Sequence, residues 1–406
     1  VLAGAREIAE AKKQAARLEK KTVKFLRDLI RLPSPSTKEA RVVKHIKKEM
    51  EAAGYDEVFV DKVGNVIGRI GSGRVRILYD SHLDTVDVGT REAWTFDPFV
   101  GKVEEGAVWG RGASDNKAGM ACMVMAGRLI KQMLLERDFT LYVMGSVQEE
   151  DCDGLAMEHA LEQSIPHPEY VVLGECTNLA VYRGHRGRME IRVFSRGVSC
   201  HASAPERGDN AVTRMARLVK EIDELNARLK NDPFLGKGTV AVTQIGCRSG
   251  SFNTVPDECS VILDRRLTAG ETRESALAEL RALPSFDPQK MAIEVLPYRA
   301  VSHTGLAVEQ EKYFPTWTVP ETSPLVQAGK QAGLWTLGQE PLVDKWTFST
   351  NGVSSMGRHN IPTIGFGPSE ERFAHSVQDQ VSLEHLRHCV MFYALFPHAL
   401  LSCLEK

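Results

Sequence analysis

The sequence has few features of a membrane or nucleic-acid-binding protein. Its most apolar expected helix, AGMACMVMAGRLIKQMLL at residues 118–135, is interrupted by Arg128 and Lys131. No segment approaches the roughly 20 apolar residues that a membrane span requires. No dense basic tract occurs, and the formal net charge of −2 gives no electrostatic footprint for nucleic acid or membrane surfaces. We therefore expect a small-molecule or peptide partner, with no nucleic acid and no membrane.

Paired cysteines and a phosphate-binding loop are also missing. Eight cysteines lie singly, without C-x-x-C, in a chain of 406 residues that is large enough to fold without disulfides. We interpret them as reduced core residues of a cytoplasmic protein. The charged helical pattern at residues 1–21 lacks the apolar segment of a signal peptide. No G-x-x-x-x-G-K-[ST] follows the glycines at 110 and 112, which argues against a nucleotide site.

The first half of the chain alternates helical and strand patterns. Helical periodicity runs through residues 5–32 and 37–54, and we expect the second helix to begin at Ser36 or Thr37 and to end at Gly54. Short apolar strands are expected at 75–79, 140–147 and 169–173. Buried strands separated by helices predict an α/β fold with a mainly parallel sheet that helices cover on both faces.

The pattern changes between about residues 187 and 298. The order there is strand, helix, two strands, helix and strand, which is typical of a ferredoxin-like β-α-β-β-α-β unit. Helix, strand and helix patterns resume after it. We predict one catalytic domain, formed by residues 1–185 and 299–406, and an inserted lid domain at 186–298.

Acidic and imidazole side chains follow the expected strands. The segment ILYDSHLDTVDVG at 77–89 places His82 and three aspartates just past a buried strand. Ligand sites in open α/β sheets form at the carboxyl ends of the strands. Burying several carboxylates is costly unless a strong positive charge neutralises them. Other strand ends and adjacent loops supply a matching set: Asp115, Glu149, Glu150, Glu175 and His375.

Two histidines with several carboxylates are typical ligands for a pair of divalent metals. Each motif alone has a simpler interpretation. An isolated H-x-D is more often surface or capping chemistry, and Glu149 with Glu150 could begin a solvated helix. The occurrence of such groups at five strand ends is hard to explain by solvation and favours the metal site.

Several sequence blocks carry a family resemblance: SHLDTV, GRGASDNKAG, QEE, GECT, GVSCHASAPERGDNAV, NTVPDE, LDRRLTAG and AHSVQDQ. In this order, over roughly residues 20–400, they resemble the di-zinc amidohydrolase family of acetylornithine deacetylase, succinyl-diaminopimelate desuccinylase, aminoacylases and glutamate carboxypeptidases. The branch labelled selenium-metabolism-linked hydrolases looks nearest. The resemblance implies a catalytic domain with an inserted lid, which such proteins often use to form homodimers.

The resemblance also implies roles for the acidic cluster. Asp115 would bridge two zinc ions. One ion would also bind His82 and Glu175, and the other would also bind Glu150 and His375. Asp84 would hold the second imidazole nitrogen of the first histidine. Glu149 would be the general base that takes a proton from zinc-activated water.

The lid would supply further groups. His201, in GVSCHAS, would stabilise the oxyanion, often across a dimer, although a buried loop histidine is the simpler interpretation. Asn253 and Arg266 would bind the substrate carboxylate, for which a planar guanidinium is well suited. A strand-edge ion pair is the alternative for the arginine. Asn351, in STNGVSS, stands where relatives often have an acidic residue. Cys152 and Cys176 are interpreted as packing residues.

We therefore expect a metal-dependent hydrolase that cleaves an amide bond of a small carboxylate-bearing substrate, of the N-acyl amino acid deacylase type. A dipeptidase or carboxypeptidase using the same site is not separable from it. Zinc is expected at two ions per subunit, although cobalt or manganese can occupy similar sites. A metal-free binding homologue would have lost some ligands. A β/α-barrel amidohydrolase would usually carry H-x-H instead of the H-x-D found here.

Overall fold

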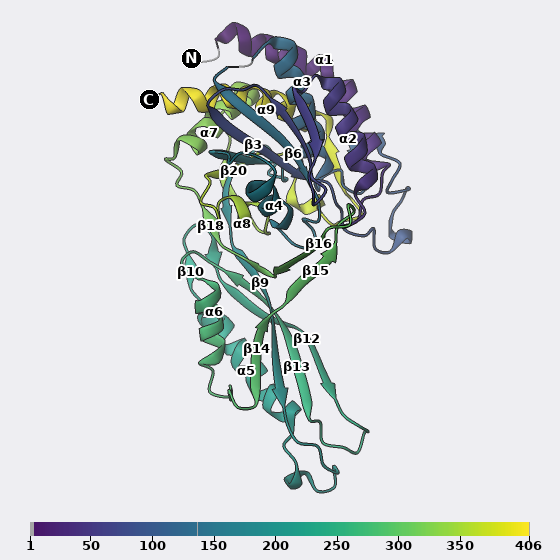
Figure 1. Cartoon of the computed structure of the whole chain (residues 1–406), viewed down its shortest axis with the longest axis vertical. Helices are drawn as coiled ribbons and strands as arrows, with labels where there is room; N and C mark the ends of the chain where they lie inside the picture. The colour runs from purple at the N-terminus through teal and green to yellow at the C-terminus, as the bar shows by residue number, and fades with distance from the viewer. Residues whose placement is uncertain (1–3, 136, 406) are drawn as a thin grey trace.

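The chain folds into two parts (Figure 1), and each part has its own core of buried apolar side chains. The computed structural model describes residues 4–135 and 137–405. The larger core takes buried side chains from both ends of the chain, from Ala11 to Leu400, whereas the buried side chains of the smaller core come from Met189 to Val295. We refer to residues 186–298 as the inserted unit. Its separate core is consistent with an inserted domain, and the two boundaries stay a prediction.

A nine-stranded sheet lies at the centre of the larger part. Its strands run in the order β1 (Glu57–Val60), β2 (Val66–Ile70), β6 (Phe139–Ser146), β3 (Val75–His82), β7 (Tyr170–Leu173), β20 (Thr363–Gly365), β8 (Val181–His185) and β18 (Trp317–Thr318), with β19 (Val343–Trp346) also paired to β8. The central strands β6, β3, β7 and β20 are parallel to one another. β1, β2 and β18 pair in antiparallel fashion. The sheet is therefore mixed, with the predicted parallel arrangement at its centre.

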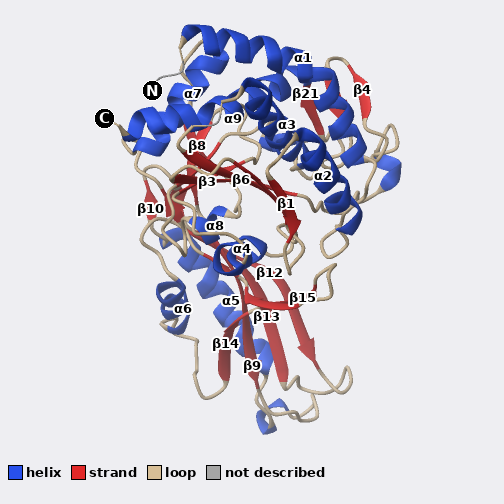
Figure 2. Cartoon of the chain, turned by 45° about the horizontal axis from the view of Figure 1, so that its top comes forward, coloured by secondary structure: helices blue, strands red, loops and turns tan. Residues whose placement is uncertain are grey.

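Helices lie on both sides of this sheet (Figure 2). One layer contains α1 (Ala5–Ile30), α2 (Ala40–Ala53), α3 (Lys117–Met133), α7 (Pro324–Leu337) and α9 (Leu383–Leu404), and the opposite side holds α4 (Leu155–Gln163) and α8 (Gly352–Ser355). α3 packs against α1, α9 and β3, so nearly all of its residues are buried. That environment explains its largely apolar sequence. Among the described residues, no helix combines the length and apolar character needed to cross a bilayer.

The start of α2 differs from the prediction. The helix begins at Ala40 instead of Ser36 or Thr37, and it ends at Gly54 as expected, with φ of 89° in the left-handed region. The hydroxyl of Ser36 donates to the Asp84 carboxylate at 2.7 Å, so it is not available as a helix cap. Thr37 itself has a positive φ of 69°. A contact from a distant segment has therefore overridden the local capping signal.

The inserted unit has the predicted element order. It contains β9 (Gly187–Arg196), α5 (Ala211–Arg228), β12 (Thr239–Arg248), β13 (Glu258–Leu267), α6 (Arg273–Arg281) and β14 (Met291–Val295). These strands form an antiparallel sheet in the order β12-β13-β9-β14. Residues of β13 alternate between buried and partly exposed, because only one face of the sheet contributes to the smaller core.

Short elements complete the fold. The hairpin of β15 (Pro297–Val301) and β16 (Ala307–Glu311) follows the inserted unit, and its polar sequence gave no strand signal. The others are β4 (Lys102–Glu104), β5 (Ala107–Trp109), β10 (Asn231–Asp232), β11 (Gly236–Lys237), β17 (Tyr313–Phe314), β21 (Gln380–Ser382) and 3-10 turns at Arg91–Ala93, Pro205–Arg207 and Glu371–Phe373.

None of the eight cysteines, all of which lie among the described residues, forms a disulfide. Five are buried, which agrees with their interpretation as core residues, and Cys152 and Cys176 are among them. The interpretation is wrong for Cys247, which is exposed, while Cys200 and Cys403 are partly exposed. Cys247 lies in the outer half of β12, where the residues from Thr243 to Arg248 are partly or fully exposed.

Candidate metal centre

The predicted acidic cluster forms one cavity at the carboxyl edge of the central strands. β3 ends at His82, while Glu149 and Glu150 follow β6 and Glu175 follows β7. These strands are parallel neighbours, so their carboxyl ends meet at one edge of the sheet. The cavity measures about 410 Å³, and its walls contain Glu149, Arg266 and all five predicted ligands.

The Asp115 carboxylate lies between the two predicted histidine ligands. Its Oδ1 is 2.8 Å from Nε2 of His82, and its Oδ2 is 3.3 Å from Nε2 of His375. Each oxygen therefore faces a different imidazole. A carboxylate that bridges two cations needs this arrangement, because each of its oxygens must reach one ion.

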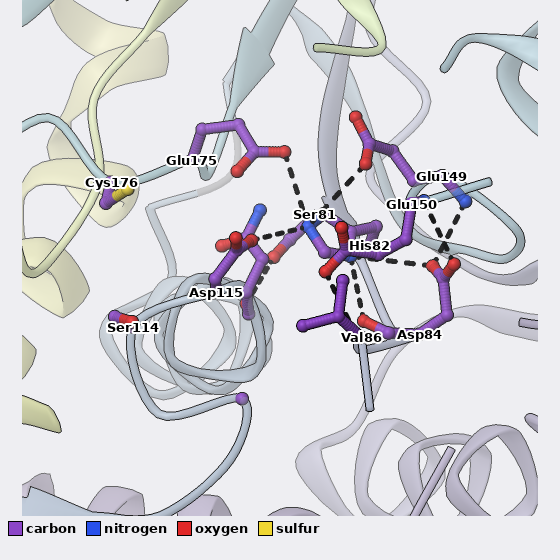
Figure 3. Close-up of polar contacts among 12 residues, drawn as sticks. Ser81, His82, Asp84, Val86, Ser114, Asp115, Glu149, Glu150, Glu175 and Cys176 are labelled. Atoms are coloured by element: carbon purple, nitrogen blue, oxygen red, sulfur yellow. Dashed lines mark hydrogen bonds and ion pairs between the residues drawn. The ribbon is translucent and has the colours of Figure 1, made fainter. Parts of the chain in front are cut away.

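The remaining carboxylates approach one or other of the two histidines. Oε1 of Glu175 is 3.6 Å from Nε2 of His82 (Figure 3). Oε2 of Glu150 is 3.0 Å from Nε2 of His375. Oε2 of Glu149 lies 4.0 Å from Nε2 of His82. Potential ligand atoms of His82, Glu149 and Glu175 all lie within 4.8 Å of one another.

Burial and close charges favour the protonated forms of most groups in this cluster. Burial raises the pKa of Glu149, Glu150 and Glu175 above the ordinary value. Oε2 of Glu175 is buried and has no hydrogen-bond partner among the described residues. Hydrogen bonds to Asp115 and Glu150 raise the pKa of His375 to about 10. Without a cation, the cluster therefore tends to hold protons.

Burial acts to raise the pKa of Asp115, but hydrogen bonds with His375 and His82 outweigh it and hold that pKa below its ordinary value. Asp115 is thus the most strongly anionic member of the set. The donors are carboxylate oxygens and imidazole nitrogens, which suit divalent zinc, cobalt or manganese. The residues fit a pair of divalent cations.

Comparisons with known proteins agree with this site. Residues 78–399, well over half of the chain, match Peptidase family M20/M25/M40. The chain belongs to the M20 peptidase family. It is 50% identical over 374 residues to the uncharacterized protein YgeY of Escherichia coli K12, covering 92% of this chain and 93% of that protein. A putative [LysW]-lysine/[LysW]-ornithine hydrolase of Pyrobaculum aerophilum is 30% identical over 366 residues, covering 88% and 92%.

A solved M20 structure has the same fold. YXEP of Bacillus subtilis, described as a dinuclear metal binding peptidase, aligns with a TM-score of 0.71 at 14% identity, over 96% of this chain and 100% of its own. Membership of the M20 family shows that the chain is a metal-dependent hydrolase that acts on amide bonds. The narrower placement in a selenium-linked branch stays a prediction.

In this M20 chain, Asp84 has more contacts than the sequence suggested. Nδ1 of His82 is 3.0 Å from the backbone oxygen of Asp84 and 3.5 Å from its carboxylate. The same carboxylate accepts the backbone N–H groups of Glu149 and Glu150, each at 3.1 Å. Asp84 therefore supports both the histidine and the loop that carries the expected base and one ligand. Only the tertiary contacts between these loops reveal the second role.

Asp115 lies at the end of the loop before α3. The peptide bond that joins it to Asn116, the N-cap of that helix, is cis. The buried Asp379 carboxylate holds this loop through hydrogen bonds to Gly112 and Ser114. Sequence reasoning did not identify Asp379, although it lies in the block AHSVQDQ that also contains His375.

The predicted substrate residues divide into two groups. Arg266 lines the metal cavity and forms an ion pair with Asp264, with 2.7 Å between Nε and Oδ1. Asn351 does not line it. The Asn351 side chain is buried, donates to Asp80 at 2.8 Å and accepts the N–H of Gly154 at 2.7 Å. Its amide is therefore used inside the protein and supports the end of β3.

His201 and Asn253 lie in exposed loops of the inserted unit, and neither lines the metal cavity. His201 forms an isolated β-bridge with Thr254, and the Ser203 hydroxyl lies 2.7 Å from its Nδ1. This exposed position differs from the simpler interpretation as a buried histidine. Within one subunit, the structure does not bring His201 or Asn253 to the metal cavity.

Proposed function

We propose that this M20 hydrolase removes the acyl group from a small carboxylate-bearing amide of the N-acyl amino acid type. Asp115 would bridge two zinc ions, held further by His82 with Glu175 and by Glu150 with His375. The observation that supports this assignment is the position of the two Asp115 oxygens, each facing a different imidazole. Cobalt or manganese could replace zinc, because their ligand preferences are similar.

Glu149 is proposed as the general base. When bound by these residues, zinc would supply Lewis-acid chemistry: it would lower the pKa of water from 15.7 towards about 7 and would polarise the amide carbonyl. Glu149 takes a proton from water and returns it to the leaving nitrogen. Burial raises the pKa of Glu149 in the metal-free cavity, and bound cations would oppose that shift, so that the carboxylate would be ionised and able to accept a proton. Asp84 keeps the side chain in place through the Glu149 backbone N–H.

The inserted unit would bind the substrate. Arg266 would bind the substrate carboxylate from the cavity wall, and Asn253 would assist it. His201 would complete the site from a second subunit of a homodimer. The free edge of β12, where Ile245 is 62% exposed, supports pairing between subunits. Asn351 would act on the substrate only indirectly, through Asp80 and the end of β3.

A dipeptidase is the second candidate, because Arg266 could equally bind the terminal carboxylate of a dipeptide. The description of YXEP as a peptidase supports this second candidate. A cytoplasmic location stays a prediction that rests on the free cysteines.

The test is a screen of N-acyl amino acids and dipeptides with zinc-loaded protein beside Glu149→Gln. The variant should keep two metal ions by elemental analysis and lose about 10² to 10⁴ in turnover, the usual contribution of a positioned general base. Glu51→Gln, on the exposed side of α2, is the matched control and should keep full activity. Equal rates for Glu149→Gln and the wild type would refute the role of Glu149. Absence of both metal and turnover in the wild type would indicate a binding homologue.

A further inference from the structure

Side-chain oxygens from other segments hold the turn that follows β6. Four consecutive backbone N–H groups, at residues 147–150, each donate to such an oxygen at 3.1 Å. Asn65 accepts the first, Glu39 accepts the second, and Asp84 accepts the last two. The last two residues of the turn are the proposed base and a proposed metal ligand. The position of both therefore depends on acceptors that are distant in the chain.

Glu39 is a fully buried carboxylate that the proposed mechanism does not use. It directly precedes α2 and is 0% exposed, but its side chain does not cap that helix. Its Oε1 accepts the N–H of Thr37 at 3.0 Å as well as that of Gln148. Its Oε2 is buried without a hydrogen-bond partner among the described residues. Burial of such a group is costly, and helix capping does not explain it.

Gln148 has a backbone conformation that depends on contacts from outside the turn. Its φ of 58° lies in the left-handed region, which residues other than glycine rarely adopt. Such a conformation persists only where the surrounding structure determines it. Glu39 holds the backbone N–H, and the Tyr298 hydroxyl donates to the side-chain oxygen of Gln148 at 3.2 Å. Because Gln148 joins β6 to Glu149, a change in its conformation would move the base.

We propose that Glu39 is a positioning residue of the metal centre, which accepts the N–H of Gln148 and so directs Glu149 and Glu150 into the cavity. This inference rests on the proposed function, in which Glu149 is the base and Glu150 a ligand. Glu39 does not line the cavity and acts only through the turn. The role requires an acceptor oxygen and no negative charge, because both partners of Oε1 are backbone N–H groups.

Two substitutions of Glu39 separate the acceptor from the charge. Glu39→Gln keeps a carbonyl oxygen that can accept both N–H groups, whereas Glu39→Met fills a similar volume without that oxygen. Ile46→Ala is the matched control. Ile46 is buried in the same helix, so its truncation should lower the stability without removing a hydrogen bond of the turn. Circular dichroism should show that each variant is folded.

Hydrogen exchange tests the turn without any metal. In chelator-treated wild type and Glu39→Gln, the amides of residues 147–150 should exchange slowly. They should exchange about 10-fold faster in Glu39→Met, the usual effect of losing one hydrogen bond. Ile46→Ala should exchange there at the wild-type rate. Fast exchange in the wild type, which needs no variant to be folded, or equal rates in Glu39→Met and the wild type would overturn the proposal.

Zinc affinity tests the consequence for the metal centre. Chelator competition should give two dissociation constants, and Glu39→Met should raise one of them about 10- to 100-fold and leave the other nearly unchanged. Glu150→Gln, which lacks a proposed ligand, identifies the constant that should rise. The same rise in Ile46→Ala would show a general loss of stability and would refute the positioning role. Equal losses in Glu39→Gln and Glu39→Met would refute the role of the acceptor oxygen.

The proposed function can fail separately. During hydrolysis at saturating zinc, Glu39→Met should lower kcat about 10-fold and leave KM unchanged, because Glu39 does not meet the substrate. If the wild type hydrolyses no amide but the exchange and zinc results are as expected, the positioning role holds and the deacylase assignment falls. If the wild type hydrolyses N-acyl amino acids and Glu39→Met keeps its kcat and both zinc constants, the reverse holds.

Discussion

The Asp379 carboxylate holds Ser114 by two hydrogen bonds to a single oxygen. Oδ1 of Asp379 accepts both the backbone N–H and the hydroxyl of Ser114, each at 2.7 Å. Oδ2 accepts the N–H of Gly112 at 2.7 Å and a guanidinium N–H of Arg111 at 3.0 Å. Because Ser114 directly precedes Asp115, a fully buried carboxylate outside the ligand set fixes the loop that carries the proposed bridging ligand.

Asp379→Asn should weaken metal binding although it removes no ligand. We expect zinc affinity to fall by about 10- to 100-fold, the usual effect of losing a group that orients a ligand. The buried Arg111 would lose its partner, so the free energy of unfolding should fall by about 3–5 kcal/mol. Competition with a zinc chelator and urea unfolding measure the two effects. Asp97→Asn, in an exposed ion pair, is the control. Unchanged affinity would show that the loop keeps its position without Asp379.

Metal removal should make stability depend on pH in a specific direction. Burial raises the pKa of Glu149 and Glu175, so the metal-free folded protein keeps protons that the unfolded chain releases above its ordinary pKa near 4.5. Stability from these groups is present below that pH and is lost as pH rises. The pKa of His375, raised to about 10 by hydrogen bonds to Asp115 and Glu150, acts in the same direction between 6.5 and 10.

Chelator-treated protein should therefore have a lower Tm at pH 8 than at pH 5.5. Zinc should raise the Tm more at pH 8, because cation binding replaces the retained protons. Differential scanning calorimetry with and without zinc measures both quantities. A metal-free Tm that increases between pH 5.5 and pH 8 would contradict the charge arrangement described for the cavity.

His185 should contribute to acid unfolding. It is completely buried, its Nδ1 donates to the Arg186 backbone oxygen at 2.8 Å, and its Nε2 accepts N–H groups of Trp317 at 2.7 Å and Thr350 at 3.1 Å. Protonation of Nε2 would break both of these bonds. Burial lowers the pKa of His185 from 6.5 to about 4, so the unfolded state binds a proton first as pH falls.

Stability from His185 is complete above pH 6.5 and is lost between 6.5 and 4, by up to about 3 kcal/mol. Urea unfolding of the wild type and of His185→Gln at pH 7 and pH 4.5 measures this loss. The unfolding free energy should change less between the two pH values in His185→Gln than in the wild type. The same difference in both proteins would mean that another group controls acid unfolding.

Subunit mixing tests whether His201 acts across a dimer. Glu149→Gln keeps the wild-type histidine, and His201→Ala keeps the wild-type base, so each homodimer should be almost inactive. Random mixing of subunits in a symmetric dimer should restore about a quarter of wild-type activity, because half of the dimers would contain one complete site. Activity equal to the mean of the two variants would exclude a contribution across the dimer.

Much of the fold followed from local patterns. The helix at 5–32, the end of α2 at Gly54 and the element order of the inserted unit all appear in the structure at or near the predicted positions. The antiparallel edge strands and the hairpin of β15 and β16 were missed. β18 pairs with β8, which lies far away in the chain, whereas β15 and β16 pair with each other and were missed because their sequences are short and polar.

The candidate site also contains residues that the sequence predicted and contacts that it did not. The acids and histidines could be identified in the sequence because they follow apolar runs and lie in the blocks that carry the family resemblance. The contacts of Asp84 with Glu149 and Glu150, and the burial of Asn351 behind the cavity, could not. Hydrogen bonds between loops follow from how the strands stack, and no local spacing encodes them.

By itself, the sequence determined which chemistry this protein can support, because residue type alone decides whether a side chain offers oxygen or nitrogen to a cation. It also determined the order of helices and strands, through the spacing of apolar residues. Only the tertiary structure decided which carboxylates face an imidazole and which hold a loop in place. Those roles depend on distances between segments that chain spacing does not specify, and burial then decides the charge that each group carries.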